Sequence, residues 1–295
     1  MLTCLDGMGL IVGIVVGAGI FSAPALVAGN AGSPVLMLSA WVLGGLISLA
    51  GAMCYAELAS LHPHPGGDYH YFKLAYGNSV SFLFAWARLT VIPTGSIALL
   101  AFVVGDYASQ IWPLGARSSS VYAALNVSGL RQGKWTQNLL TVLEVTGVGL
   151  VIVAGLWLSA APPSPTAPGD PTSTNWGLIL VFVMMTYGGW NEAAYISAEL
   201  RHPERNIARV LFWSIAAVTT LYVLVNLAYL NALGLAGTSD SDAIAADVMR
   251  QDFGEIGARL VSLFIAIAAL TSANATILMG ARVTYAFGRD VRLFS

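Results

Sequence analysis

Seven apolar segments of membrane-spanning length dominate this sequence. They lie near residues 7–28, 34–61, 79–112, 137–160, 176–198, 209–233 and 256–281. A helix needs about 20 predominantly apolar residues to cross the hydrocarbon core of a bilayer. Charged residues make up only 9% of the chain, against roughly 25% in an average soluble protein. The sequence therefore predicts an all-α integral membrane protein.

The positions of lysine and arginine predict an eighth crossing. Residues 119–130 contain too few apolar side chains to be identified as a span from hydropathy alone. If this stretch nevertheless crosses, nearly all loop lysines and arginines lie on one side, which suits the cytoplasmic face. Those residues are Lys73, Arg131, Lys134, Arg201, Arg205, Arg209, Arg282, Arg289 and Arg292. We therefore expect eight spans with a shortened fourth span and a cytoplasmic N-terminus.

Two of the spans carry glycines in their middle, in "VGAGIFSAP" and in "TYGGWNE". Gly17 and Gly19 interrupt the first span, and Gly188 and Gly189 interrupt the sixth. Paired glycine breaks in corresponding segments of two halves point to a transporter binding site at the bilayer midplane. Free N–H groups at the start of a half-helix attract a carboxylate, and freed carbonyls can hold an ammonium group. The pair predicts a receptor for a zwitterionic α-amino acid; the alternative is a small-residue packing face.

Arg88 lies inside the third predicted span. An intramembrane charge is a functional candidate by default. The alternative is that its guanidinium reaches the cytoplasmic interface along a flexible stem.

Other features argue against several function classes. The net charge of −2 offers no basic surface for nucleic acid. Cys4 and Cys54 have no metal-ligand spacing, and prolines and glycines separate the histidines of "LHPHPGGDYHYFK". No nucleophile and base pair stands within the spans. We expect no enzyme activity, no cofactor and no bound metal.

Four ordered motifs carry a family resemblance: "VGAGIFSAP", "CYAELASLHPHPGGDYHYFKLAYG", "TYGGWNEAAYISAELRHPERNIARVL" and "NATILMGARVTYAFGRD". Together they resemble the amino acid–polyamine–organocation superfamily, most closely the bacterial stand-alone form of its L-type amino acid transporter branch. The resemblance implies two inverted five-helix repeats with discontinuous helices 1 and 6. On this chain the first repeat is 1–160, an external Pro-rich linker is 161–175, and an incomplete second repeat is 176–295.

The resemblance also implies roles for individual residues. The backbone N–H groups of Gly17, Ala18, Gly19 and Ile20 would bind the substrate carboxylate. Val16 and the carbonyls of Met185, Thr186 and Gly188 would bind the amine, with Tyr187 and Trp190 lining the pathway. Met185 stands where relatives commonly have an aromatic gate. Residues 113–120 contain no cysteine, so no disulfide-linked ancillary subunit is expected.

Glu144 departs from the family pattern, because L-type relatives usually have a lysine at this place. If the fifth span begins near Thr136, Glu144 lies about 12 Å along the helix, inside the hydrocarbon region. A buried carboxyl without a cation could bind and release a proton during transport. The alternatives are a sodium ion held with the first break and Thr271 or Ser272, a carboxyl kept protonated by a neighbour's hydrogen bond, or a tolerated change in a decaying gene.

The sequence thus predicts a secondary transporter, a permease or exchanger, that moves α-amino acids through a plasma or bacterial inner membrane by alternating access. Its partners would be the amino acid and the lipid bilayer. Relatives continue for about four more helices after "GRDVRLFS", so we expect the chain to be C-terminally incomplete. The alternative is a ligand-binding or sensor protein on a degenerate transporter scaffold.

Overall fold

The computed structural model describes residues 3–64, 66–111, 134–159, 174–196 and 200–290, and within these ranges it is helical with no strand. In chain order the elements are α1 (Cys4–Val15), η1 (Ala18–Phe21), α2 (Ala23–Ala31), α3 (Pro34–Leu61), α4 (Gly67–Thr90), α5 (Ile92–Ile111), α7 (Lys134–Val153), η3 (Ala154–Leu158), α8 (Trp176–Tyr187), η5 (Trp190–Glu192), α9 (Ala193–Ile196), α10 (Pro203–Ser239) and α11 (Ile244–Asp290). The all-α prediction is confirmed for this part of the chain. The segments 34–61, 67–111 and 204–239 are long and apolar enough to cross a membrane. The predicted fourth span, 119–130, lies outside the described residues, as does most of the 161–175 linker.

Helix starts follow local sequence signals. At α1 the Thr3 side chain accepts a hydrogen bond from the Asp6 N–H, and the Asp6 side chain accepts one from the Thr3 N–H. At α3, Ser33 caps the helix just before Pro34, whose missing N–H costs nothing at the first helical position. Asn175 caps α8 in the same way, by accepting from the Leu178 N–H at 3.2 Å. These caps fix where the apolar helices begin.

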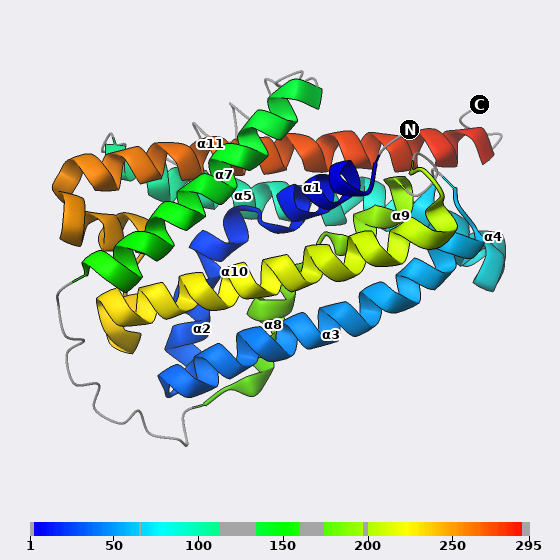
Figure 1. The fold of residues 1–295 in the computed structure, drawn as a ribbon. Coiled ribbons are helices and arrows are strands. Elements are labelled where there is room, and N and C mark those ends of the chain that lie inside the picture. Colours follow the sequence, from blue (N-terminus) through cyan, green and yellow to red (C-terminus); the bar gives the residue numbers. More distant parts are fainter. Residues whose placement is uncertain (1–2, 65, 112–133, 160–173, 197–199, 291–295) are drawn as a thin grey trace.

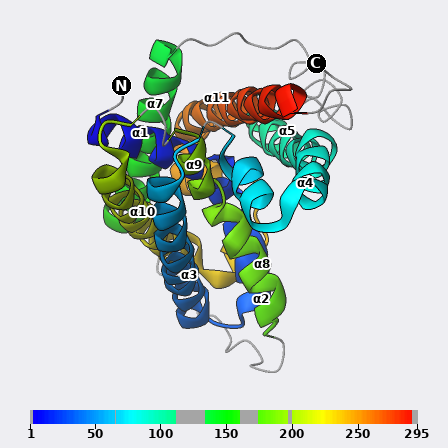
Figure 2. The same ribbon diagram turned by 90° about the vertical axis from the view of Figure 1, so that its right-hand side faces the viewer.

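The axes of the long helices α3, α10 and α11 are roughly aligned across Figure 1, with α10 antiparallel to the other two. The start of α1, α4, α9 and the end of α11 gather at one end of the molecule, and the connections α2–α3 and α10–α11 lie at the other. α10 packs against α3 and α1, while α11 packs against α5 and α7. The shorter α2 and α8 lie side by side in both views (Figure 2) and are in contact. The second half of one interrupted helix therefore lies beside the first half of the other.

Small residues let these helices approach closely. A Cβ atom at Gly155 in η3 would lie 2.7 Å from the carbonyl oxygen of Ala228 in α10. At Gly44 and Gly45 in α3 a Cβ atom would run into side chains of α8 and α10. Helix pairs in membranes pack through such small residues because the backbones can then touch.

Candidate substrate-binding site

The first predicted span is interrupted after Val15. The Val16 N–H still donates to the Val12 carbonyl at 2.8 Å, but Gly17 is extended, with φ −72° and ψ −177°. The 3-10 turn η1 then begins, and its first hydrogen bond runs from the Ile20 N–H to the Gly17 carbonyl at 3.4 Å. Within the described ranges, the N–H groups of Gly17, Ala18 and Gly19 have no hydrogen-bond partner. The helix is thus broken where the glycines predicted, with free donors at the start of its second half.

The sixth predicted span is interrupted after Tyr187. Gly188 is extended, and Gly189 has a φ of 107°, a conformation that side-chain-bearing residues rarely adopt. A Cβ atom at Gly189 would also lie 2.9 Å from the Ile14 side chain. The Gly188 N–H donates to the Met185 carbonyl at 3.2 Å, which closes α8. A glycine is required at the sharpest point of this break.

The two breaks touch each other. A Cβ atom placed on Gly19 would lie 3.5 Å from the Thr186 Cγ2 atom and 3.7 Å from its Cα. Gly189 faces Ile14, at the end of α1. The unwound backbone of both helices therefore lies in one place.

Tyr222 of α10 joins the two breaks. Sequence reasoning did not identify this residue. Its hydroxyl donates to the Val15 carbonyl at 2.6 Å and also lies 3.1 Å from the Thr186 carbonyl. The side chain is fully buried, and its ring lies against those of Trp41 and Tyr187, with centroid separations of 5.5 Å and 5.0 Å. One hydroxyl thus holds the last carbonyl of α1 next to the last turn of α8.

The aromatic residues predicted to line the pathway contact α3. The Tyr187 hydroxyl donates to the Trp41 carbonyl at 2.9 Å, and the side chain is buried. Trp190 packs edge-on against Tyr55 at 5.2 Å. Met185, in contrast, has 59% of its surface exposed in the protein. Tyr187 and Trp190 therefore fasten the second break to α3.

The predicted coupling residues lie near the first break. Glu144 is buried in α7, and its Oε1 atom has no hydrogen-bond partner within the described residues. It interacts electrostatically with Tyr222. A Cβ atom on Gly17 would lie 3.4 Å from the Ser272 Oγ atom of α11. Tyr222 and Gly17 thus link Glu144 and Ser272 to the same break, while the Thr271 side chain lies outside the described residues.

Arg88 forms a buried ion pair instead of reaching water. Its Nη2 atom contacts the Glu192 Oε1 atom in η5, and each side chain is only 11% exposed. The neighbouring Asn191 donates to the Asp68 carboxylate at 3.2 Å. The snorkelling alternative for Arg88 is therefore wrong, and the pair fixes η5 to α4.

No group of three or more His, Cys, Asp or Glu side chains that could hold a metal occurs in the described part of the chain. His64 stacks on His70 with a centroid separation of 4.0 Å. Cys4 and Cys54 form no disulfide. The segment 113–120, on which the expectation about an ancillary subunit depends, lies outside the described residues.

The sequence matches known transport proteins over nearly its whole length. The b(0,+)-type amino acid transporter 1 of Rattus norvegicus is 30% identical over 308 residues, which cover 97% of this chain and 62% of the relative. The large neutral amino acids transporter small subunit 2 of Mus musculus is 30% identical, with 98% and 58% covered. The serine/threonine exchanger SteT of Bacillus subtilis (strain 168) is 26% identical, with 98% and 68% covered.

This chain thus spans about three fifths of the length of the two mammalian relatives. The model of the amino acid permease family matches residues 2–293. The chain belongs to the amino acid permease family.

Proposed function

We propose that this chain forms the substrate-binding part of a secondary transporter, a permease or exchanger that moves α-amino acids by alternating access. The observation that carries the proposal is the meeting of two helix breaks, one of which presents free N–H groups. The names of the relatives, which are amino acid transporters and an exchanger, support the same substrate class.

The proposed site recognises a zwitterion without a charged side chain. The free N–H groups of Gly17, Ala18 and Gly19 bind the carboxylate, helped by the positive end of the half-helix dipole. Val16 and the carbonyls of Met185, Thr186 and Gly188 bind the ammonium group. Tyr222 keeps the two sets of backbone groups at a fixed separation.

The proposed architecture is the inverted five-helix repeat, with residues 1–160 and 176–295 as its two parts, eight spans and a cytoplasmic N-terminus. Its support is the placement of segments in Figure 1, where the start of α1, the start of α10 and the end of α11 share one end. Arg201, Arg205 and Arg209 belong to that end, which suits the cytoplasmic face. The membrane is then a plasma membrane or bacterial inner membrane.

Glu144 is the proposed coupling residue. Among the charged side chains that the structure describes, none forms an ion pair with it. A buried carboxylate without a cation is strongly destabilised, so Glu144 takes up a proton in one state of the cycle and releases it in another. Sodium bound between Glu144, the first break and Ser272 is the competing possibility that the experiment must separate.

The test combines binding with flux. Calorimetry on the purified protein should detect binding of α-amino acids and no binding of the corresponding decarboxylated amines. In proteoliposomes, Glu144→Gln should abolish the pH dependence of uptake and leave counterflow exchange measurable. The matched control is Glu57→Gln, because Glu57 is exposed. Full pH dependence in Glu144→Gln would exclude Glu144 as the proton carrier, and sodium-dependent uptake lost in the same variant would favour the sodium site.

A further inference from the structure

A row of buried polar side chains runs along one face of α10. Tyr222, Asn226 and Tyr229 follow each other at intervals of four and three residues, which places them on the same side of the helix. All three are fully buried. We call these three residues, together with Glu144 beside Tyr222, the polar row.

The polar row has hydrogen-bonding capacity that the protein does not use. The Asn226 Nδ2 atom donates to the Tyr222 carbonyl at 2.8 Å, but its Oδ1 atom has no partner among the described residues. The same holds for the Tyr229 hydroxyl and for Glu144 Oε1. A buried polar group without a partner destabilises the folded protein. Folded proteins satisfy such groups with ordered water when no protein atom is within reach.

One end of the polar row lies at the proposed coupling residue. Tyr222 interacts electrostatically with Glu144. The helices packed against α7 are α1, α10 and α11. Tyr222 on α10 interacts with Glu144, and among the described residues no lysine or arginine on these helices forms an ion pair with Glu144. No described cation therefore blocks proton uptake at this end.

The other end leads to Tyr107 of α5. Tyr229 interacts electrostatically with Tyr107. The Tyr107 hydroxyl donates to the Phe21 carbonyl at 2.9 Å and accepts from the Ala245 N–H at 3.4 Å. Tyr107 also interacts with the carboxylates of Asp106 and Asp247. The row thus continues toward the start of α11.

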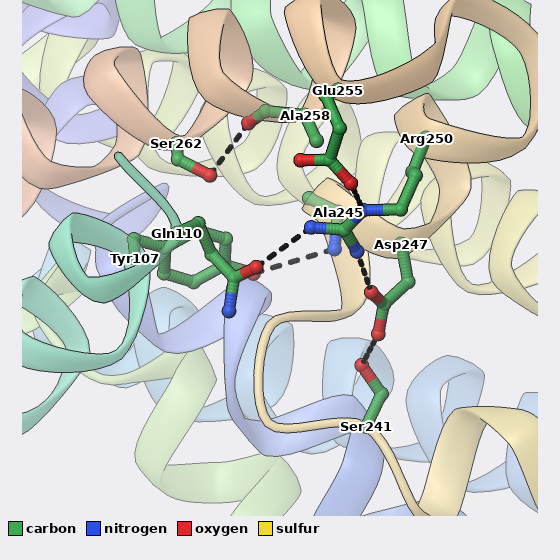
Figure 3. A network of polar contacts seen from close by, with 9 residues as sticks. All are labelled: Tyr107, Gln110, Ser241, Ala245, Asp247, Arg250, Glu255, Ala258 and Ser262. Atoms are coloured by element: carbon green, nitrogen blue, oxygen red, sulfur yellow. Dashed lines mark hydrogen bonds and ion pairs between the residues drawn. The ribbon is translucent and has the colours of Figure 1, made fainter. Parts of the chain in front are cut away.

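Figure 3 shows the charged cluster that follows. Arg250 donates to Gln110 and to Glu255, each at 2.7 Å, and pairs with Asp247. The side chains of Arg250 and Asp247 are 32% and 35% exposed. This cluster is therefore exposed at the protein surface, whereas the polar row is buried.

We propose that the polar row binds a chain of ordered water molecules and conducts protons between Glu144 and the Asp247–Arg250 cluster. The proposal rests on the proposed function, in which Glu144 exchanges a proton. Tyr222 and Tyr229 are seven residues apart, or about 10 Å along the helix. Hydrogen bonds between oxygens of about 2.8 Å allow about three waters to span this distance.

Proton conduction along such a chain conserves atoms and charge. Each water or hydroxyl accepts a proton from one neighbour and gives its own to the next, so only O–H bonds break and form. The result is one proton gained by the Glu144 carboxylate and one lost by water at the exposed cluster. A single cation fits this arrangement poorly, because its ligands must converge on one point and these oxygens lie on successive helical turns.

The experiment follows the carboxyl group of Glu144 by infrared spectroscopy of the full chain in lipid nanodiscs. Glu144→Gln identifies its band, and transfer to heavy water gives the rate at which its proton exchanges. Asn226→Leu and Tyr229→Phe should each slow this exchange by about tenfold or more. Tyr229→Phe removes only one oxygen, so it keeps the test valid if Asn226→Leu folds poorly. Thr220→Val is the matched control, because Thr220 lies on the exposed side of the same helix.

Slower exchange in Tyr229→Phe, with parent-like exchange in Thr220→Val, would support the proton route. Unchanged exchange in Tyr229→Phe would overturn it and leave the proposed function intact. A Glu144 band that shifts when sodium chloride replaces choline chloride would show a bound cation and would also overturn the water chain. If Glu144 carries no proton at any pH at which the protein stays folded, its role in the proposed function fails as well.

Discussion

Gly19 offers the sharpest test of the substrate site, because it lies where the two helix breaks meet. A Cβ atom there would be 3.5 Å, 3.7 Å and 3.8 Å from the Cγ2, Cα and Oγ1 atoms of Thr186. These are ordinary van der Waals separations, so a single methyl group fits. Gly19→Ala should therefore change the free energy of unfolding by less than about 1 kcal/mol.

Gly19→Val should behave differently. Its two γ-carbons extend beyond the Cβ position and must push Thr186 or η1 aside, and overpacking of this kind costs about 1–3 kcal/mol. The displacement also moves the N–H groups of Ala18 and Gly19 away from the carboxylate. We expect amino acid affinity to fall at least about tenfold, or about 1.4 kcal/mol.

Isothermal titration calorimetry on the purified protein measures both variants, with Gly9 as the matched control position. A Cβ atom at Gly9 meets nothing within 4 Å, so Gly9→Val should bind like the parent. Unchanged affinity in Gly19→Val for every amino acid that the parent binds would remove the first break from the site. Equal losses in Gly9→Val and Gly19→Val would show that the effect comes from helix propensity and not from the contact with Thr186.

Three further predictions concern Tyr222, the Arg88–Glu192 ion pair and the membrane topology. Tyr222→Phe should lower the free energy of unfolding by about 1–3 kcal/mol, because the buried Val15 carbonyl at the first break loses its donor; a denaturant titration with the parent's midpoint would contradict this. Arg88→Met and Glu192→Leu should each destabilise the protein by about 3–5 kcal/mol, because each removes one partner of a buried ion pair, and the double variant should recover most of the loss. Additive losses in that double-mutant cycle would mean that the two side chains do not interact. In a variant without native cysteines, a cysteine placed within 161–175 should react with an impermeant maleimide from outside and one within 201–206 should not; the reverse pattern would mean that residues 119–130 do not cross.

The interruptions in the first and sixth spans could be predicted because their signal is local. Gly17, Gly19, Gly188 and Gly189 stand inside runs that are otherwise apolar, and the structure breaks both helices at these glycines. The role of Tyr222 could not be found in this way. Its acceptor at Val15 is 207 residues away in the sequence, so only the packing of α10 against α1 brings the two together.

The interpretation that the Arg88 side chain reaches the cytoplasmic interface was wrong for a related reason. A hydropathy window evaluates each residue only against its neighbours, and an isolated arginine near a span end is typical of a side chain that reaches water. Its partner Glu192 is 104 residues away and also lies in an apolar span. Each charge looks unfavourable alone, and only the folded bundle shows that they neutralise each other.

The 3-10 turn η5 fixes the rotational setting of the half-helix that follows it. A 3-10 helix has three residues per turn, so Trp190, Asn191 and Glu192 point about 120° apart. They reach α3, the start of α4 and the Arg88 end of α4, respectively. Insertion or deletion of one residue here would rotate all three side chains to the wrong partners at once. The three contacts together therefore allow the turn, and the half-helix after it, only one rotational orientation.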